Sequence, residues 1–500
     1  MKLYSNLVAG KWEEGSAFFS TSTGEFAIAS QKHVDQALEE ADRCFDAYCQ
    51  TSLNQRIELL LKISENLTAA KETILAAYRQ ESNLPEGRAA GEFGRTLAQI
   101  GTFIALLTKG DYLQASIFQP NEGAELRKMM HPIGPVAVFG ASNFPLAFST
   151  AGGDTISALA AGCPVIVKAH PYHPLTSYLV AKAIQKAITQ AHLPQGIFAH
   201  LQSDQHALGK AIVEHSLLKG VGFTGSFSGG KALYDIAQKR PIPIPVFAEM
   251  GSINPIVVFP GMYKQVDTIK QLRDSITLGA GQFCTNPGLL IALGNKAQLD
   301  ELETRLSNYL MEKEDQAMVH ENIAEQFQLK LNELKEKVML YGGHQGALAV
   351  TSAAEFLANK QLSEEVFGPY SILVRCENRD EVSQVILSLD GQLTLTFLGE
   401  EKNHKDIAKL IPLAQQKAGR ILFQGVPTGV AVTQTMTHGG PYPASTDSRF
   451  TAVGTDAIYR WLRPVSYQDC PNSLLPPALQ DANPWKIPQK RNGDLNSPES

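Results

Sequence analysis

The sequence has no long run of like charge and only a small excess of acidic residues. Its 44 lysine and arginine residues against 50 aspartate and glutamate residues give a formal net charge of −6. Proteins that bind nucleic acid or a membrane surface usually carry a basic stripe or patch. We therefore expect neither a nucleic acid nor a membrane as a partner.

Long apolar segments are also missing. The most apolar window, residues 136–161, is interrupted by several glycines, by Asn143 and by Asp154. A membrane-spanning helix would have to bury these polar groups in the bilayer, so this segment does not predict one. The first five residues, Met1–Ser5, lead into polar sequence rather than the apolar core of a signal peptide. These features favour a cytoplasmic location.

Cysteines are few and scattered. There are six in 500 residues, with no Cys-x-x-Cys pair and no spacing typical of a zinc site. We therefore expect no disulfide framework and no metal site. Five of the cysteines are interpreted as buried, reduced thiols, whereas Cys284 lies in a glycine-rich segment and is considered separately below.

The pattern of apolar residues predicts the α/β class. After a first hundred residues that we expect to be helical, short β-branched segments alternate with helical patterns, which predicts parallel sheets with right-handed crossovers. The ligand then lies at the carboxyl ends of the strands. The predicted helices of the first half are 33–50, 54–79, 86–107, 174–191 and 229–238, and its strands are 136–139, 165–167, 197–201, 221–223 and 246–248.

A second alternating region begins near Gly251. Its predicted strands are 289–293, 371–374, 393–398 and 421–424, and its helices are 268–278, 299–313, 379–389 and 404–417. The polar segment 115–132 reads as an extended excursion, and the tail after Leu475 is predicted to lack regular structure. The predicted domains are therefore residues 1–250 with the excursion 115–132, residues 251–440, and a C-terminal segment 441–500.

The segment around Cys284 combines glycines with a thiol at a helix-to-strand junction. Glycines before the cysteine allow a tight turn and a close approach to a ligand. A thiol in such a turn can become a nucleophile if its pKa is lowered, and its backbone N–H can face a developing oxyanion. On these residues alone, a nucleophile and a small buried core residue both remain open.

Two further segments offer groups for acid–base and oxyanion chemistry. Glu249 follows a buried strand and lies among small and apolar residues, where partial burial would raise its pKa and suit it to general-base work. Asn143 lies in a strand-to-helix turn, from which its side-chain amide can donate to an oxyanion. The alternatives are a structural ion pair for Glu249 and an ordinary turn asparagine for Asn143.

Three segments suggest a site for a dinucleotide. A strand, a small-residue turn and a helix start follow one another in Gly222–Gly230, the order needed to bind a pyrophosphate through backbone N–H groups. A lysine, Lys168, ends a buried strand at the same edge of the sheet. Glu365 and Phe367 precede another strand. Each of these signals is weak when taken alone.

Taken together and in order, these motifs resemble the aldehyde dehydrogenase superfamily. The matching segments cover nearly the whole chain and are Phe139–Pro145, Val167–Lys168, Phe223–Ser226, Glu249–Gly251, Gly281–Cys284 and Glu365–Pro369. The resemblance implies a Rossmann-type cofactor domain, a second α/β catalytic domain and a small oligomerisation excursion.

The resemblance also implies a role for each motif. Cys284 would be the nucleophile, forming a thiohemiacetal and then a thioester. Asn143 and the Cys284 N–H would form the oxyanion hole, and Glu249 would be the base. Cofactor contacts are implied for Lys168 and Glu365 at the two riboses, for Gly225, Ser226, Gly229 and Gly230 at the pyrophosphate, and for Phe367 within the Glu365 motif.

The C-terminal third is similar to one subgroup, the 2-oxoglutarate semialdehyde dehydrogenases. The matching segments are Gly425–Val430, His438–Ala444, Asp447–Arg449 and Leu462–Val465, together with Gly152–Thr155. The resemblance implies oxidation of the small aldehyde 2,5-dioxopentanoate to 2-oxoglutarate. The alternatives are an NADP-dependent dehydrogenase of succinic or fatty aldehydes, a CoA-acylating relative and a catalytically silent structural member. The presence of Glu249 argues against the CoA-acylating relative, and its retention together with Cys284 and Asn143 argues against the silent member.

Cofactor choice and assembly are the last two expectations. NAD-selective members have a glutamate three residues after the ribose-binding lysine, where it would repel a 2′-phosphate. Here that position is Pro171, and the neighbouring His170 and His173 can carry positive charge or donate to a phosphate. We therefore expect NADP to be accepted at least as well as NAD.

The excursion 115–132 and a strand-like stretch at 462–467 resemble the family's oligomerisation elements and indicate a homodimer or a dimer of dimers.

Overall fold

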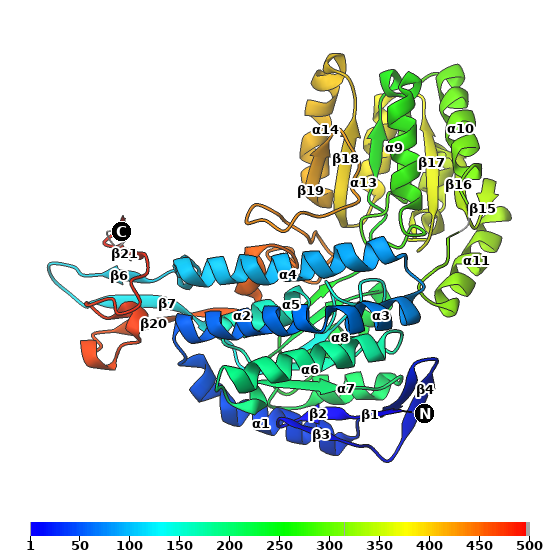
Figure 1. The fold of residues 1–500 in the computed structure, drawn as a ribbon. Helices are drawn as coiled ribbons and strands as arrows, with labels where there is room; N and C mark the ends of the chain where they lie inside the picture. The colour runs from blue at the N-terminus through cyan, green and yellow to red at the C-terminus, as the bar shows by residue number, and fades with distance from the viewer. Residues whose placement is uncertain (1, 315, 497–500) are drawn as a thin grey trace.

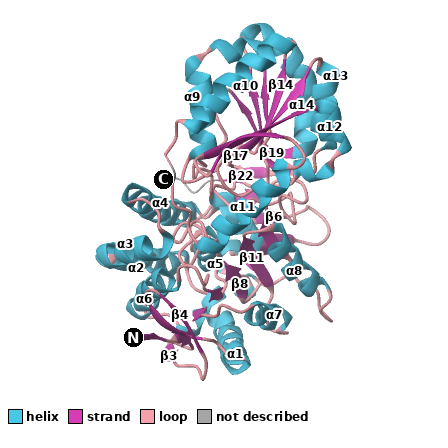
Figure 2. Cartoon of the chain, turned by 90° about the vertical axis from the view of Figure 1, so that its right-hand side faces the viewer, coloured by secondary structure: helices cyan, strands magenta, loops and turns pink. Residues whose placement is uncertain are grey.

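Two seven-stranded sheets, each covered by helices on both faces, organise the chain (Figures 1 and 2). The computed structural model describes residues 2–314 and 316–496. Of two smaller sheets, a three-stranded and a five-stranded one, the five-stranded sheet projects from the first unit as an arm. The segment that contains Cys284 joins α9 to β14 within the second unit and lines a cleft with residues of the first unit.

The first large sheet has the strand order β12-β11-β8-β9-β10-β2-β3. The five strands from β12 to β10 pair in parallel, and β2 joins β10 antiparallel. Strand β8 is buried along its whole length, as expected for a strand covered on both faces. The strands are β2 (Asn6–Val8), β3 (Lys11–Glu13), β8 (Val136–Phe139), β9 (Val165–Lys168), β10 (Phe198–Leu201), β11 (Gly220–Thr224) and β12 (Val246–Glu249).

Helices cover both faces of this sheet with separate apolar clusters. One cluster holds α1 (Gln31–Cys49), α7 (His206–Glu214) and α8 (Phe227–Gln238) against the strands. The other face is covered by a layer of α2 (Leu53–Ala69), α4 (Glu86–Lys109), α5 (Gly153–Ala161) and α6 (Pro174–Gln190). Figure 1 shows α4 as the outermost helix of this layer, facing the second unit.

The second sheet has the order β15-β16-β17-β14-β13-β18-β19, with only β15 antiparallel to its neighbour. Its strands are β13 (Ile256–Val258), β14 (Leu289–Leu293), β15 (Met339–Gly343), β16 (Gly346–Ser352), β17 (Tyr370–Cys376), β18 (Gln392–Leu398) and β19 (Ala418–Phe423). Helices α9 (Val266–Thr277) and α10 (Lys296–Met311) pack on one face. The other face carries α11 (Glu321–Lys335), α12 (Ala353–Ala358), α13 (Arg379–Ser388) and α14 (His404–Lys417).

The arm is a five-stranded sheet built from distant parts of the chain. Its order is β20-β7-β6-β21-β22, so β20 has a neighbour on one side only. Strand β20 pairs antiparallel with β7 from Leu462↔Pro132 to Gln468↔Leu126. The strands are β6 (Ser116–Phe118), β7 (Leu126–Pro132), β20 (Leu462–Gln468), β21 (Gln489–Arg491) and β22 (Asp494–Asn496).

The predicted strands and helices of both α/β regions are confirmed to within a few residues, but three local predictions were wrong. The N-terminal residues form short strands rather than only helices, including β1 (Leu3–Tyr4), β4 (Phe18–Thr21) and β5 (Gly24–Ala27). These strands are too short to show an alternating pattern. The predicted helix 54–79 is divided at Ala70 into α2 and α3 (Lys71–Ser82).

The third wrong prediction concerns the tail. Strands β21 and β22 form a hairpin, and β21 also pairs with β6, a contact that no local pattern reveals. The last part of the predicted irregular tail, residues 497–500, lies outside the described residues.

The described residues bear on two features of the sequence, the lack of a long apolar segment and the scattered cysteines. No helix there is long and apolar enough to span a bilayer. All six cysteines are free thiols; Cys44, Cys163 and Cys376 are buried, whereas Cys49 and Cys470 are partly exposed, so the predicted burial of these two was wrong.

Candidate active site

A strained turn after α9 presents Cys284. Gly279, Ala280 and Gly281 have φ values of 56°, 54° and 66°, three successive residues in the left-handed region. A Cβ on Gly281 would lie 2.1 Å from the carbonyl oxygen of Gly368, so only glycine fits there. The turn is therefore pressed against the loop that leads into β17, and the cysteine lies at its end.

Side-chain amides fix the backbone around this cysteine. Asn254 Nδ2 donates to the Cys284 carbonyl at 2.8 Å and to the Asn286 carbonyl at 2.9 Å. Gln282 Oε1 accepts from the Val319 N–H at 2.9 Å. Because these amides are buried and bonded at both ends, the thiol has a defined position before any ligand arrives.

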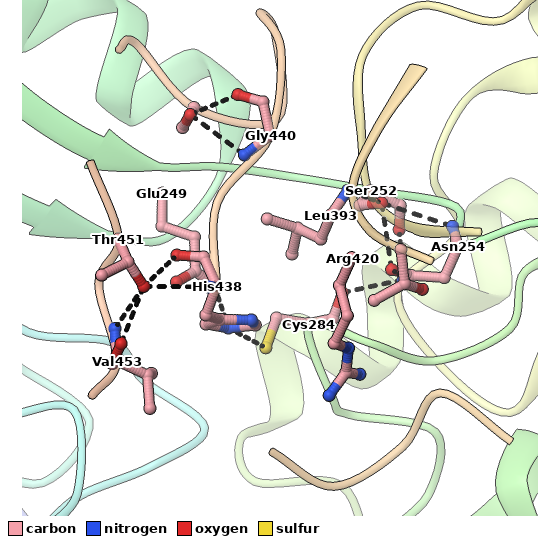
Figure 3. A network of polar contacts seen from close by, with 12 residues as sticks. Glu249, Ser252, Asn254, Cys284, Leu393, Arg420, His438, Gly440, Thr451 and Val453 are labelled. Atoms are coloured by element: carbon pink, nitrogen blue, oxygen red, sulfur yellow. Dashed lines mark hydrogen bonds and ion pairs between the residues drawn. The ribbon is translucent and has the colours of Figure 1, made fainter. Parts of the chain in front are cut away.

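The sulfur belongs to a three-group cluster (Figure 3). His438 Nε2 lies 3.4 Å from Cys284 Sγ and 2.9 Å from Glu249 Oε1. The side chains of His438 and Glu249 are only 1% and 2% exposed. The backbone N–H of His438 donates to Thr451 Oγ1 at 2.9 Å, which fixes the main chain that carries the imidazole. One imidazole nitrogen is therefore within reach of both the thiol and the carboxylate.

Burial determines the protonation of this cluster. Desolvation raises the pKa of the Cys284 thiol well above its ordinary range, and the charge of Glu249 raises it further. The resting thiol is thus protonated at neutral pH and needs a base in contact with it. Nε2 of His438 can accept the thiol proton in one tautomer and donate to Glu249 in the other. A proton can therefore move from sulfur to carboxylate without passing through bulk water.

The side chain of Asn143 also reaches the turn. Its Nδ2 donates to the carbonyl of Gln282 at 3.0 Å. Arg88 Nη2 donates to the Asn143 carbonyl at 2.7 Å, and the buried carboxylate of Glu92 accepts from two N–H groups of the residues that follow. Within the described residues, the Cys284 N–H donates no backbone hydrogen bond. Asn143 and Cys284 line the same cleft, and their role as oxyanion donors stays a prediction.

One large cleft connects these groups with the predicted cofactor residues. Its volume is 2480 Å³, and it extends from the carboxyl ends of the first sheet to the loop before β17. The cleft is lined by Cys284, Glu249 and Asn143 together with Lys168, Gly225, Ser226, Gly229, Glu365 and Phe367. Gly230 does not line the cleft and packs against the side chain of Met250, which an added Cβ would approach to 2.7 Å.

The cleft fits a dinucleotide in both size and chemistry. Ser226 caps α8, accepting from the Gly229 N–H at 3.3 Å, and the first turn of this helix faces the cleft as an anion site. Burial lowers the pKa of Lys168 to about 8 and raises that of Glu365 to about 7. A helix N-terminus, a lysine and a carboxyl group thus follow one another along a single cleft.

The two histidines near Pro171 do not carry the charge we expected of them. His173 is fully buried, with Nε2 3.0 Å from the Ala141 carbonyl and Nδ1 3.2 Å from Ser177 Oγ. Burial lowers the pKa of His173 to about 4 and that of His170 well below its usual value. Both rings are neutral at physiological pH, so neither supplies a cation to a 2′-phosphate. That part of the cofactor prediction was wrong.

Sequence reasoning missed His438 as a site residue. The sequence shows it only as the start of a His-Gly-Gly motif, 154 residues after Cys284, with no helix or strand to place it. The ligand atoms of His438, Cys284 and Glu249 lie within 4.8 Å of one another. Thiolate, imidazole and carboxylate are also zinc ligands. The set can therefore hold a divalent cation as well as a proton, although sequence spacing predicted no metal site.

A cysteine and a base at the end of a dinucleotide-sized cleft between two α/β units define a dehydrogenase of the aldehyde-oxidising class. The chain belongs to the aldehyde dehydrogenase family, whose family model matches residues 16–406. Membership makes it an enzyme that oxidises an aldehyde with a nicotinamide dinucleotide, as the motifs predicted.

Two relatives are similar over nearly their whole length. Alpha-ketoglutaric semialdehyde dehydrogenase 2 of Azospirillum brasilense is 44% identical over 95% of both chains. Alpha-ketoglutaric semialdehyde dehydrogenase of Acinetobacter baylyi is 41% identical over 94% of this chain and 93% of the relative.

Solved structures share the fold at lower identity. A 1-pyrroline-5-carboxylate dehydrogenase superposes with a TM-score of 0.81 at 19% identity, covering 93% of this chain and 92% of the other. Betaine aldehyde dehydrogenase of Staphylococcus aureus gives 0.82 at 15% identity, covering 94% and 96%. The predicted fold class is confirmed by these similarities.

Proposed function

We propose that this enzyme oxidises 2,5-dioxopentanoate, the semialdehyde of 2-oxoglutarate, to 2-oxoglutarate. The observation that carries the proposed chemistry is the contact of His438 with both Cys284 and Glu249 at the end of the cleft. The substrate is supported by the two relatives at 44% and 41% identity that are named for this aldehyde.

The reaction begins with the thiol. Because its pKa is raised, Cys284 must lose its proton to a neighbour as it attacks the aldehyde carbon, and His438 Nε2 at 3.4 Å is in place to take it. Glu249 then stabilises the imidazolium that forms, from 2.9 Å. The product of this step is a thiohemiacetal whose oxygen carries the developing negative charge.

Two donors receive that oxygen. In this proposal they are the Asn143 amide, which also donates to the Gln282 carbonyl at 3.0 Å, and the Cys284 N–H; preorganised donors of this kind are worth about 10²–10³ in rate. When bound, the nicotinamide ring of the cofactor supplies the acceptor for the hydride of the former aldehyde carbon. Collapse of the oxyanion leaves an acyl group on Cys284 as a thioester.

Hydrolysis of the thioester needs a base for water. Glu249 is the candidate because both of its oxygens lack a hydrogen-bond donor other than His438 in the described part of the chain. A CoA-acylating enzyme would hand the acyl group to a thiol and would not need this buried carboxylate. The arrangement therefore favours release of a free carboxylic acid.

The cofactor is held by the residues that line the cleft with Cys284. In this proposal Lys168 and Glu365 bind the two riboses, Phe367 packs beside the second, and the α8 turn from Gly225 through Gly230 takes the pyrophosphate. We propose that NADP is accepted at least as well as NAD. Pro171 presents no carboxylate to a 2′-phosphate, and Lys168 supplies the nearby positive charge.

A Pro171→Glu variant tests the cofactor assignment. A carboxylate about 4 Å from a phosphate costs about 1–4 kcal/mol, which corresponds to an expected shift of about 10- to 1000-fold toward NAD. The measurement is the ratio of kcat/KM for the two cofactors with one aldehyde held saturating. Pro171→Gln is the matched control, because it adds a similar side chain without charge. A wild-type ratio that favours NAD a hundredfold would show that another residue sets the choice.

We also propose that the enzyme works as a homodimer or a dimer of dimers. Strand β20 ends the arm sheet and leaves its outer backbone groups unpaired within the described residues, a template for pairing with a second chain. Exposed apolar residues, Phe118 and Leu126, lie on the same arm. Sedimentation at micromolar concentration is expected to give two or four times the chain mass. A single species near 54.4 kDa would contradict this proposal.

A substrate panel tests the proposed function itself. We expect kcat/KM for 2,5-dioxopentanoate to exceed that for succinic semialdehyde and for neutral fatty aldehydes with either cofactor. Formation of reduced cofactor is followed by absorbance, and the acid product is identified chromatographically. A preference for a long-chain aldehyde would overturn the substrate, while release of an acyl-CoA only in the presence of CoA would overturn hydrolysis.

A further inference from the structure

Two arginines outside the cofactor cleft lie close to Cys284. Arg95 is on α4, and its guanidinium carbon lies 5.6 Å from the centre of the Phe148 ring. The Phe148 ring is in turn 6.3 Å from the His438 ring, which contacts the sulfur. Arg420 comes from β19, and Figure 3 shows its side chain extending past Cys284. The two cations thus approach the nucleophile from different units of the fold.

Both arginines hold the same loop. Arg420 Nη2 and Nη1 donate to the carbonyls of Pro427 and Gly429 at 2.6 Å and 3.2 Å. Arg95 Nη1 donates to the carbonyl of Val430, the next residue along. The loop 427–430 therefore joins the two guanidinium groups and sets their separation.

Neither arginine has an acidic partner. In the described part of the chain, no carboxylate oxygen lies within 4.0 Å of Arg95 or Arg420, whereas the buried Arg127 and Arg460 each form an ion pair. The Nε–H groups of Arg95 and Arg420 are buried and donate to nothing. Both side chains are half-buried, and a buried N–H donor without an acceptor is costly unless something completes its hydrogen bonding.

The ionisable groups near Arg95 and Arg420 leave the charge of both guanidinium groups unpaired. Burial lowers the pKa of both guanidinium groups, and a negative charge on the Cys284 sulfur, when the thiol is ionised, acts in the opposite direction on each pKa. The carboxylates that face Arg95 are Glu92 and Glu249. Glu92 already accepts three hydrogen bonds from Tyr78 and the 146–147 backbone, and Glu249 is paired with His438. An unpaired positive charge is left beside the reacting sulfur.

We propose that Arg95 and Arg420 bind the carboxylate at the far end of an anionic aldehyde and so select semialdehydes of dicarboxylic acids over neutral aldehydes. The planar guanidinium fork matches a carboxylate and donates two parallel hydrogen bonds to it. The inference rests on the proposed function and extends it, because 2,5-dioxopentanoate carries its carboxylate at the end opposite its aldehyde. One end of the substrate then meets Cys284 while the other is fixed by the arginines.

Matched pairs of aldehydes test this assignment. The quantity measured is the ratio of kcat/KM for succinic semialdehyde to that for butanal, a neutral aldehyde of the same carbon number, with 2,5-dioxopentanoate as a third substrate. Arg95→Met and Arg420→Met are each expected to lower the ratio by about 10- to 100-fold, mainly through KM of the anionic aldehyde. Activity with butanal should persist, since no charge on that substrate needs a partner.

Controls separate recognition from folding. Arg240→Met removes a guanidinium that also donates to three backbone carbonyls, those of Val213, Ser216 and Leu218, and its ratio should equal that of the wild type. If a methionine variant does not fold, Arg95→Lys and Arg420→Lys keep the charge and lose the fork, and a fall of about 3- to 10-fold is expected. Glutarate serves as a probe of binding without turnover, because its inhibition constant against butanal should rise in the same variants.

The results distinguish a failure of the proposed arginine site from a failure of the proposed substrate. A wild-type enzyme that prefers butanal to both semialdehydes would overturn the proposed substrate before any variant is made. A wild-type preference for the semialdehydes that survives unchanged in folded Arg95 and Arg420 variants would leave the function standing and overturn the arginine site.

Discussion

Replacing Cys284 by alanine is expected to abolish aldehyde oxidation, with kcat falling by about 10⁴-fold or more, because the thioester route has no other nucleophile. Among the described residues, no other cysteine lines the cleft. Cofactor binding should be nearly unchanged, since the residues proposed to hold the dinucleotide lie elsewhere along the cleft. The measurements are formation of reduced cofactor with 2,5-dioxopentanoate and a fluorescence titration with NADPH.

A matched control is available in Cys49, another partly exposed free thiol. Its sulfur donates to the carbonyl of Asp46 on helix α1, away from the cleft. Cys49→Ala should therefore retain wild-type turnover. Substantial turnover by Cys284→Ala, or equal losses in both variants, would rule out the assigned nucleophile.

Replacing Glu249 by glutamine is expected to separate the two halves of the reaction. Attack by sulfur can still use His438, so a first turnover should occur. Water activation then fails, and steady-state turnover should fall by about 10²–10⁴-fold. Stopped-flow absorbance should show a burst of reduced cofactor, about one equivalent per active site, followed by a slow phase.

His438→Asn is the companion variant because it removes the group that touches the sulfur. We expect it to slow the burst itself, whereas Glu249→Gln slows mainly the phase that follows. The raised pKa of Cys284 gives the physical reason, since a protonated thiol needs a base in contact with it. A Glu249→Gln enzyme with the wild-type steady-state rate at neutral pH would exclude this carboxylate as the base.

Local patterns in the sequence were enough to predict the two α/β regions. Strands β8 and β14 are continuous apolar segments bounded by turn residues, and their lengths and alternation with helices give the fold class. The sequence predicted a shared site for Glu249, Asn143 and Cys284 because Glu249 ends β12, Asn143 follows β8, and Cys284 lies in the turn between α9 and β14. Their common cleft is the expected consequence.

The residues that were missed lie where no local pattern exists. His438 belongs to an irregular segment, and only the folded chain brings it to Cys284 across 154 positions. Arg95 reads as one polar residue on an amphipathic helix, and Arg420 as one on a strand. What distinguishes them is a buried Nε–H without an acceptor on a guanidinium group that lies near Cys284, which is a property of the packing rather than of the sequence.

The histidines beside Pro171 illustrate the opposite error. Two histidines next to a predicted phosphate site suggested positive charge, but burial removes that charge from both. A sequence shows which groups can titrate and does not show how far each is from water. The proposal that NADP is accepted at least as well as NAD therefore depends on the missing carboxylate at Pro171 and on Lys168.

We expect the substrate to become covalently bound to Cys284 and Glu249 to be needed for its release. The most direct measurement is rapid quenching of Glu249→Gln with 2,5-dioxopentanoate and NADP, followed by mass spectrometry of the digested protein. We predict a 2-oxoglutaryl thioester on the peptide that contains Cys284, in step with the reduced cofactor formed. Reduced cofactor without an adduct, or an adduct on any other cysteine, would contradict the account.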